Sequence, residues 1–283
     1  MLRLNAQSRS DSEIDRYKQL KSVFQSLWNY RHFITSSIQG ELKRRIARSS
    51  LGALWFILHP LLQAAIFALV LSELMAARLP GVTNKAGFAI YLMAGLAAWG
   101  LFAEIANRCT SIFIENAGVL KKISFPRLCL PIIVGGSALL NHVLLLIATT
   151  IVFLFFGHLP GAAWVVLPIG MLIITVFAFG LGVLLGIFNV FARDVGHVFA
   201  VIVQLWFWLT PIVYTPGTLP ESLSWLAVFN PMAPLVEVYQ NAMLYNTYPQ
   251  WETLLMPTAV AVTLFILSFE VFRRASVDLV DEL

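Results

Sequence analysis

Polar side chains within long apolar stretches are the residues of this sequence that could carry out chemistry. A proton relay or a hydrolytic site requires paired carboxylates, or a histidine and a carboxylate, three or four residues apart on a helix. No such pair lies within one apolar stretch of this chain. The polar residues there are His59, Gln63, Glu73, Glu104, Asn107, Asn141, His142, Asn189 and Gln204. We therefore expect structural hydrogen bonding from them, and we assign no catalytic, cofactor-binding or metal-binding residue.

The composition predicts an all-α integral membrane protein. Hydrophobic residues make up 59% and charged residues 12% of the 283 residues, whereas a soluble domain carries about 25% charged residues. So little charge could not keep the surface in water, and lipid must cover most of it. The two cysteines, Cys109 and Cys129, have neither the spacing of a metal site nor the number for a disulfide framework. The basic residues follow membrane topology, so we expect no nucleic-acid partner.

Six stretches are apolar and long enough to cross a bilayer, which takes about 20 residues. No formally charged residue lies between Arg127 and Arg193. As one helix this stretch would be about three bilayer cores long, so it must fold back once, and 157–161 is the predicted turn. The predicted spans are residues 52–71, 87–103, one span on either side of this turn, 195–214 and 253–269. Prolines interrupt residues 215–252, where one or two short re-entrant or interfacial helices are predicted.

The basic residues predict the orientation. Of the 19 Lys and Arg residues, only Arg78 and Lys85 fall on the outer side of the six-span arrangement. Because cytoplasmic loops carry the excess of basic residues, both ends of the chain are predicted to lie in the cytoplasm. The predicted divisions are an N-terminal segment (1–50), a transmembrane domain (51–275) with a cytoplasmic loop at 107–128, and a tail (276–283).

The N-terminal segment is predicted to contain an amphipathic helix. Apolar residues recur at helical spacing from about residue 17 to 50, with basic residues between them. Such a helix fits the cytoplasmic membrane interface, where basic side chains meet anionic headgroups of the membrane lipids. A helix packed on a soluble partner is the alternative, and the two are compatible. The candidate residues of this interface helix are Trp28, Arg31, Arg44, Arg45 and Arg48.

The loop at 107–128 combines apolar and basic residues. A short connection between two spans needs no apolar side chains, so this pattern favours docking into a groove on another protein. The alternative is a loop that only anchors the ends of the helices. Its candidate contact residues are Asn116, Leu120, Lys121, Lys122, Phe125, Pro126 and Arg127.

Four segments resemble one family of membrane proteins. They are residues 48–55 with the following His59-Pro60-Leu61, residues 116–131, residues 189–194 and residues 229–232. In order and spacing they are similar to the permease subunits of ABC exporters for O-antigen, teichoic acid and capsular polysaccharides. The resemblance covers nearly the whole chain.

The resemblance implies a homodimer that binds two copies of a soluble ATPase subunit. The loop at 107–128 would make the coupling contact with the ATPase, the N-terminal helix would help to form a cytoplasmic gate, and re-entrant helices would cover the outer side. The sequence has no G-x-x-x-x-G-K-[ST] phosphate loop. We therefore expect ATP and Mg²⁺ to bind to the partner subunit, and no cofactor in this chain.

Aromatic residues in two of the spans suggest contact with sugars. Trp99 lies in the second span and Trp206, Trp208 and Tyr214 lie in the fifth. Aromatic rings stack on the apolar faces of sugars, but interfacial belts of Trp and Tyr are also common in membrane proteins. A G-x-x-x-G pattern at 182–186 predicts close helix packing, either within one subunit or between two.

We interpret the chain as the transmembrane subunit of an ATP-driven exporter and not as an enzyme. The predicted cargo is a lipid-linked polysaccharide that is moved across the bacterial inner membrane, and O-antigen is the favoured polysaccharide. Two alternatives remain: an ABC permease for drugs or smaller lipids, and an ion-coupled carrier. The sequence does not identify the sugars or the length of the polymer.

Overall fold

The structure is a computed structural model, and it describes residues 25–47, 54–66, 85–122, 125–215, 228–275, 279 and 282–283. These residues form helices, and they contain no strand. The helices are α2 (Arg31–Ala47), α3 (Trp55–Ile66), α5 (Lys85–Glu115), α6 (Ala117–Lys122), α7 (Cys129–Phe155), η4 (Ala162–Val166), α8 (Leu167–Phe191), α9 (Asp194–Leu209), α11 (Met232–Gln240), η7 (Asn241–Tyr245), η8 (Trp251–Leu254) and α12 (Leu255–Ala275). The candidates Arg48 and Glu73 lie outside the described residues, as do parts of the first span and of the outer segment.

Four helical stretches are long and apolar enough to cross a membrane: residues 87–115, 129–155, 162–191 and 251–275. They confirm the second, third, fourth and sixth predicted spans. The fifth corresponds to α9, a shorter apolar helix of 16 residues. Of the first, the structure describes α3. The total of six spans therefore stays a prediction.

The helix α5 extends beyond the predicted end of the second span. The charged residues Glu104 and Arg108 were expected to stop it after Ala103, but the helix continues to Glu115. The two charges are compatible with the helix because they pair with each other four residues apart and with neighbouring helices. The connection between α5 and α7 is consequently shorter than the predicted loop and contains the small helix α6.

The turn predicted between the third and fourth spans is confirmed. Gly157 has a φ of 75°, a left-handed conformation that glycine adopts without steric cost. Gly161 lies so close to the side chain of Asn246 that a Cβ atom there would overlap with it. Asn246 Oδ1 accepts a hydrogen bond of 2.9 Å from the backbone N–H of Ala163. The turn is thereby joined to the segment after α11.

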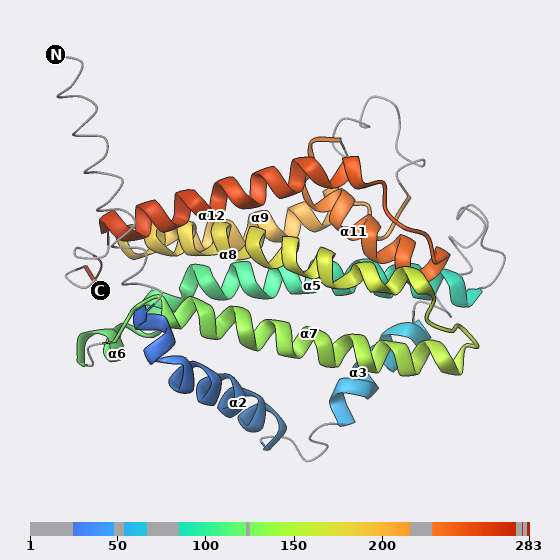
Figure 1. Cartoon of the computed structure of the whole chain (residues 1–283), viewed down its shortest axis with the longest axis horizontal. Helices are drawn as coiled ribbons and strands as arrows, with labels where there is room; N and C mark the ends of the chain where they lie inside the picture. The colour runs from blue at the N-terminus through green and yellow to red at the C-terminus, as the bar shows by residue number, and fades with distance from the viewer. Residues whose placement is uncertain are drawn as a thin grey trace.

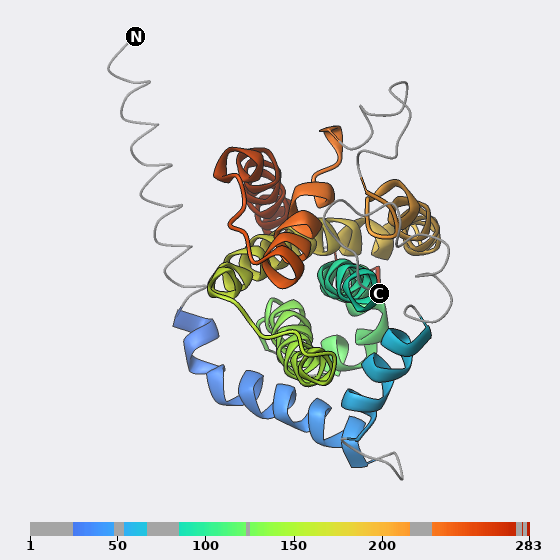
Figure 2. The ribbon, with the colours of Figure 1, turned by 90° about the vertical axis from the view of Figure 1, so that its right-hand side faces the viewer.

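The helix α5 forms the centre of the bundle. Seen along the long axis, it is surrounded by α7, α8, α9 and α11 (Figure 2). In its apolar span 78% of the residues are buried, against 33% in α7 and 22% in α12. A helix that is apolar all round belongs in the interior of a bundle. The outer helices α7 and α12 instead present apolar side chains outward, as helices in contact with lipid do.

The two ends of the bundle differ in charge. The small helix α6 and the C-terminal end of α12 lie at one end, and the α7–α8 turn and α11 lie at the other (Figure 1). The first end carries Lys121, Lys122, Arg273 and Arg274. The structure thus collects at one end basic residues that are far apart in the sequence.

Glycines of α8 allow neighbouring helices to approach closely. A Cβ atom at Gly186 would lie 2.5 Å from the backbone oxygen of Cys109 in α5, and one at Gly182 would lie 2.8 Å from that of Ala106. The G-x-x-x-G pattern therefore packs α8 against α5 within one protomer. Gly180 faces α12 in the same way, since its Cβ would lie 2.7 Å from the backbone nitrogen of Phe265.

The substitution Gly186→Ala is expected to destabilise the protein. The added methyl group meets backbone that cannot rotate away, and overpacking of this kind costs about 1–3 kcal/mol. Thermal unfolding of the detergent-solubilised chain measures the loss. Gly100→Ala is the matched control, because a Cβ there meets nothing within 4 Å and alanine favours a helix. An unfolding temperature of Gly186→Ala equal to that of Gly100→Ala would contradict the α5–α8 contact.

Candidate functional site

The helix α2 lies across the N-terminal part of α7, at the end of the bundle where α6 lies. Its side facing the bundle consists of half-buried residues spaced as one helix face: Ile34, Ser37, Ile38, Glu41, Leu42 and Ile46. Ile38 packs over Gly136 of α7, where a Cβ would lie 2.5 Å from Ile38 Cδ1. The opposite side of α2 is polar and exposed. The helix is thus packed on the protein, and its contact with a membrane surface stays a prediction.

Most predicted residues of this interface helix are exposed. Trp28 is 68% exposed, and the guanidinium of Arg31 lies 5.1 Å from the centre of its ring. Arg31 also donates a hydrogen bond of 2.9 Å to the backbone oxygen of Trp28. Arg44 is exposed, and Arg45 lies in the same helix.

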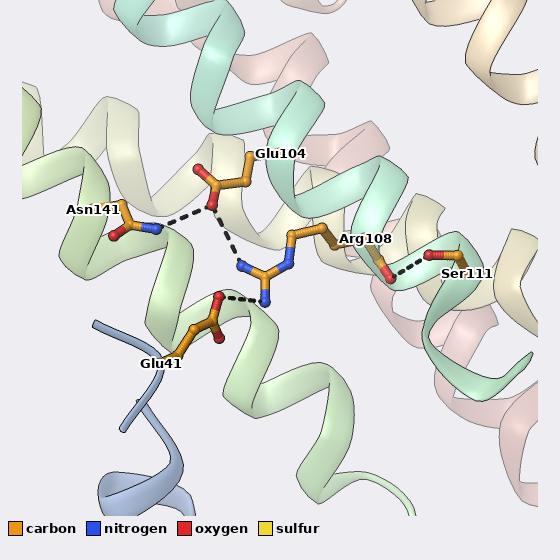
Figure 3. A network of polar contacts seen from close by, with 5 residues as sticks. All are labelled: Glu41, Glu104, Arg108, Ser111 and Asn141. Atoms are coloured by element: carbon orange, nitrogen blue, oxygen red, sulfur yellow. Dashed lines mark hydrogen bonds and ion pairs between the residues drawn. The ribbon is translucent and has the colours of Figure 1, made fainter. Parts of the chain in front are cut away.

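A polar network joins α2, α5 and α7 (Figure 3). Arg108 of α5 lies between two carboxylates: its Nη2 is 2.8 Å from Glu41 Oε1 of α2, and its Nη1 is 3.4 Å from Glu104 Oε1. Asn141 of α7 donates a hydrogen bond of 3.1 Å to the same oxygen of Glu104. We refer to Glu41, Glu104, Arg108 and Asn141 as the three-helix network.

The three-helix network gains strength from its partial burial. The charged side chains in it are about one-third exposed, so water screens them less than on an open surface. An exposed ion pair contributes at most about 1 kcal/mol, and pairs that share a charge in a network contribute more. Loss of Arg108 would leave two carboxylates facing each other. The network therefore determines how firmly α2 is held.

The connection between α5 and α7 contacts α2 as well. The ring centres of Phe125 and Phe33 of α2 are 5.8 Å apart. Leu120 is buried in the core. Asn116 closes the end of α5 with a hydrogen bond of 2.9 Å to the backbone oxygen of Ile112. These residues fix the shape of the connection within the protomer.

The outward face of the connection is basic with one apolar side chain. Lys121 and Lys122 are exposed, and Val119 is 42% exposed. Pro126 and Arg127 are half-buried. Whether these residues bind a partner is not tested by the fold. Of the apolar residues that the sequence indicated as contacts, Leu120 is buried and Phe125 is half-buried, and among the described residues of α6 Val119 is the exposed large apolar side chain.

Two of the predicted glycan-lining aromatics lie within the protomer. Trp99 is 7% exposed and meets Trp206 edge-on, with ring centres 6.1 Å apart. Trp206 in turn contacts Phe102 and Phe177, so the cluster joins α5, α8 and α9. Its Nε1 donates a hydrogen bond of 2.9 Å to Asn230 Oδ1. These contacts give both rings a role in packing.

The other two aromatics are more accessible. Trp208 is 62% exposed. Tyr214 is half-buried. Its backbone oxygen accepts a hydrogen bond of 3.1 Å from the hydroxyl of Tyr91. Contact with a glycan stays a prediction for all four residues, and Trp208 is the one whose ring is most open to a ligand.

Two asparagines, from the family-like segments 189–194 and 229–232, form hydrogen bonds that fix the connections between helices. Asn189 donates to the backbone oxygen of Thr110 at 3.0 Å and accepts from the backbone N–H of Gly196 at 2.8 Å, so the α8–α9 connection is tied to α5. Asn230 donates to Thr210 Oγ1 at 2.9 Å and accepts from the N–H of Met232 at 3.0 Å. Both amides are buried and hydrogen-bonded, as groups out of contact with water must be.

No catalytic cluster is present in the described part of the chain. His142 is buried and its Nε2 lies 3.0 Å from the hydroxyl of Tyr239, a contact between α7 and α11. The described residues contain no group of three metal-binding side chains. The polar groups named above are engaged in joining helices. Together these features define a class: a polytopic helical membrane protein whose described polar groups connect its helices.

The chain belongs to the family of ABC-2 type transporters, whose family model matches residues 33–244. It is 30% identical to the O-antigen export system permease protein RfbA of Klebsiella pneumoniae over 241 residues, which cover 83% of this chain and 88% of the relative. A second RfbA of that species is 32% identical over 219 residues, or 74% and 80% of the two chains. RfbA of Myxococcus xanthus is 29% identical over 253 residues, or 89% and 95%.

The substitution Arg108→Gln is expected to loosen α2. Loss of the cation leaves Glu41 and Glu104 without their shared partner, so tryptic cleavage of α2 at Lys43 in membrane preparations should become roughly fivefold faster. Arg274→Gln is the control, because among the described residues Arg274 pairs with Glu270 of its own helix α12 and not with α2. Equal cleavage rates in the two variants would show that the three-helix network does not hold α2.

Proposed function

We propose that the chain is the transmembrane subunit of an ATP-driven exporter that moves a lipid-linked polysaccharide across the bacterial inner membrane. The favoured cargo is O-antigen. The observation that carries the proposal is the similarity over most of the chain to permeases named for O-antigen export. The functional protein is then a homodimer with two copies of an ATPase subunit, which binds ATP and Mg²⁺.

The membrane arrangement completes the proposal. Six spans arise if α3 with the residues after it, and α9 with the residues after it, also cross the bilayer. The end with α6 is cytoplasmic, in agreement with its basic residues Lys121, Lys122 and Arg274. Both ends of the chain then lie in the cytoplasm. The segment from 215 to 252, with the short helix α11 packed on α5 and α8, then covers the outer side as a re-entrant structure.

The exposed face of the α5–α7 connection is the proposed contact with the ATPase. It presents Val119, Lys121 and Lys122, while Leu120 anchors it in the core. An exposed helical turn with one apolar and two basic side chains suits a groove with acidic edges on a soluble partner. The inward anchoring of Leu120 would make the connection move as a unit with α5.

The contacts of α2 suggest how motion of the α5–α7 connection is transmitted to the cytoplasmic gate, which α2 is proposed to help form. Phe125 packs on Phe33 of α2, and Arg108 of α5 pairs with Glu41, about two turns further along α2. A push by the ATPase on α6 would therefore shift α2 together with the connection. The interface helix would act as the moving part of the cytoplasmic gate, and a passage between two protomers would open and close.

The double substitution Lys121→Glu/Lys122→Glu is expected to abolish binding of the ATPase. We predict roughly tenfold less ATPase captured on the tagged chain in detergent when both subunits are co-expressed, because two attractive charges become repulsive. Arg274→Glu is the control, a charge reversal at the same end of the bundle but away from α6. Equal capture by all three proteins would refute the contact. Transport by the chain alone in vesicles without ATP would replace the exporter with an ion-coupled carrier.

The substitution Phe125→Ala is expected to uncouple ATP hydrolysis from export. It removes the ring contact with Phe33 but leaves Lys121 and Lys122 in place, so the ATPase should still bind and hydrolyse ATP. Surface O-antigen should fall roughly tenfold, as expected for the loss of a coupling of about 1.4 kcal/mol. Phe155→Ala is the matched control, because it removes a ring that is 78% exposed at the other end of the bundle. Normal export by Phe125→Ala would show that the Phe33–Phe125 contact transmits no motion.

A further inference from the structure

A cavity of about 600 Å³ lies between α2 and α7. Its apolar wall consists of Ile38 and Leu42 of α2 and Leu140 of α7. Its polar wall consists of Glu41, Arg44, Ser137 and Asn141. The volume is in the range of pockets that hold small molecules, roughly 300–1,000 Å³. One wall suits hydrocarbon and the other suits a polar group, so the lining fits an amphiphile.

The position of the cavity follows from the way α2 crosses α7. The two helices are in close contact where Ile38 packs over Gly136. Towards its C-terminal end α2 tilts away from α7 (Figure 1). Ser137 lies about eight residues into α7, or about 12 Å from its first turn, which is within one leaflet of a bilayer.

Ser137 is the unusual polar group of this cavity. Its side chain is 4% exposed, and its Oγ has no hydrogen-bond partner among the described residues. Other hydroxyls of the apolar helices donate to the backbone oxygen four residues before them, as in Thr110, Thr150 and Thr175 at 2.6–2.8 Å. An unpaired buried hydroxyl costs free energy, so a ligand atom that pairs with it would be stabilised.

Arg44 is the positively charged residue that lines the cavity. Glu41 is 2.8 Å from Arg108, which offsets its negative charge. Arg44 is exposed, and within the described residues it makes no ion pair. A guanidinium binds a phosphate with two parallel hydrogen bonds. The polar end of the amphiphile is therefore an anionic phosphate.

We propose that this cavity binds one glycerophospholipid of the cytoplasmic leaflet. Its phosphate contacts Arg44, an ester oxygen accepts a hydrogen bond from Ser137, and an acyl chain lies along the apolar wall. The lipid would fill the space between α2 and α7 and keep α2 in the position that the Glu41–Arg108 pair requires. The inference depends on the proposed orientation of the chain in the membrane and not on its cargo.

The test is the amount of phospholipid that stays bound to the full-length chain. The chain is extracted from membranes in mild detergent, washed, and analysed by lipid mass spectrometry, from cells that make the glycan and from cells that do not. Arg44→Gln and Ser137→Leu are compared with wild type, and Lys43→Gln is the matched control. In addition, a photoreactive phosphatidylglycerol in phosphatidylethanolamine vesicles is crosslinked to the wild-type chain, and the labelled peptides are identified.

Wild type and Lys43→Gln should retain about one phospholipid per chain, and Arg44→Gln and Ser137→Leu roughly fivefold less, as expected for loss of one charged contact or of the space itself. The label should fall on α2 and on α7 around Ser137. Equal retention in Arg44→Gln and wild type overturns the proposal, as does an equal loss in Lys43→Gln. Recovery of a glycan-linked lipid in place of a glycerophospholipid also overturns it. If Ser137→Leu does not fold, Arg44→Gln and the crosslink decide.

Discussion

The burial of α5 on almost every side is the constraint on which the rest of the structure depends. Its end away from α6 holds Tyr91, whose hydroxyl donates a hydrogen bond to the backbone after α9. Its middle carries Trp99 in the aromatic cluster, and its other end carries Arg108 and then the connection with α6. A single straight element thus contacts both the outer segment and the proposed ATPase site. Displacement of α5 would affect both ends of the molecule together.

Polar side chains join helices in this structure where apolar contacts alone could not. Apolar helix faces attract lipid chains as well as each other, so packing and hydrogen bonds decide which helices meet. Asn189 accepts a hydrogen bond from the N–H of Gly196 and Asn230 donates one to the backbone oxygen of Leu209, at the two ends of α9, and His142 meets Tyr239 between α7 and α11. Each contact also removes a buried polar group that would otherwise be costly. Asn141, His142 and Asn189 thus each connect their helix to a neighbouring one, and a structural role for the other polar residues at membrane depth stays a prediction.

The sequence predicted those parts of the fold that depend on local composition. Four spans follow from runs of apolar residues, and the turn at 157–161 follows from its glycines and proline. The pattern at Gly182 and Gly186 predicted a close helix contact but could not say that its partner is Cys109 of α5, because spacing describes one helix and not its neighbour.

The candidate site was less predictable, for the same physical reason. The pair of Glu41 and Arg108 joins residues far apart in the chain, so no local pattern indicates it, although the spacing of Glu104 and Arg108 was a usable signal. Trp99 and Trp206 could not be assigned to packing because the direction of a side chain around its helix depends on tertiary contacts. Leu120 was taken for an exposed residue since the sequence does not show that α6 folds back on the core.

The length of α5 has a consequence for depth in the bilayer. Its 31 residues measure about 46 Å, whereas the hydrocarbon core is about 30 Å thick. The apolar part between Lys85 and Glu104 is about as long as the core, so in the proposed membrane arrangement Arg108 and its two carboxylates would lie at the level of the lipid headgroups, where ions stay hydrated. The last turns carry α6 roughly another 10 Å outward, a distance comparable to the screening length of physiological salt. The three-helix network would then lie at the boundary between membrane and water. Lys121 and Lys122 would lie beyond the anionic membrane surface, which would otherwise compete with the ATPase for their charges.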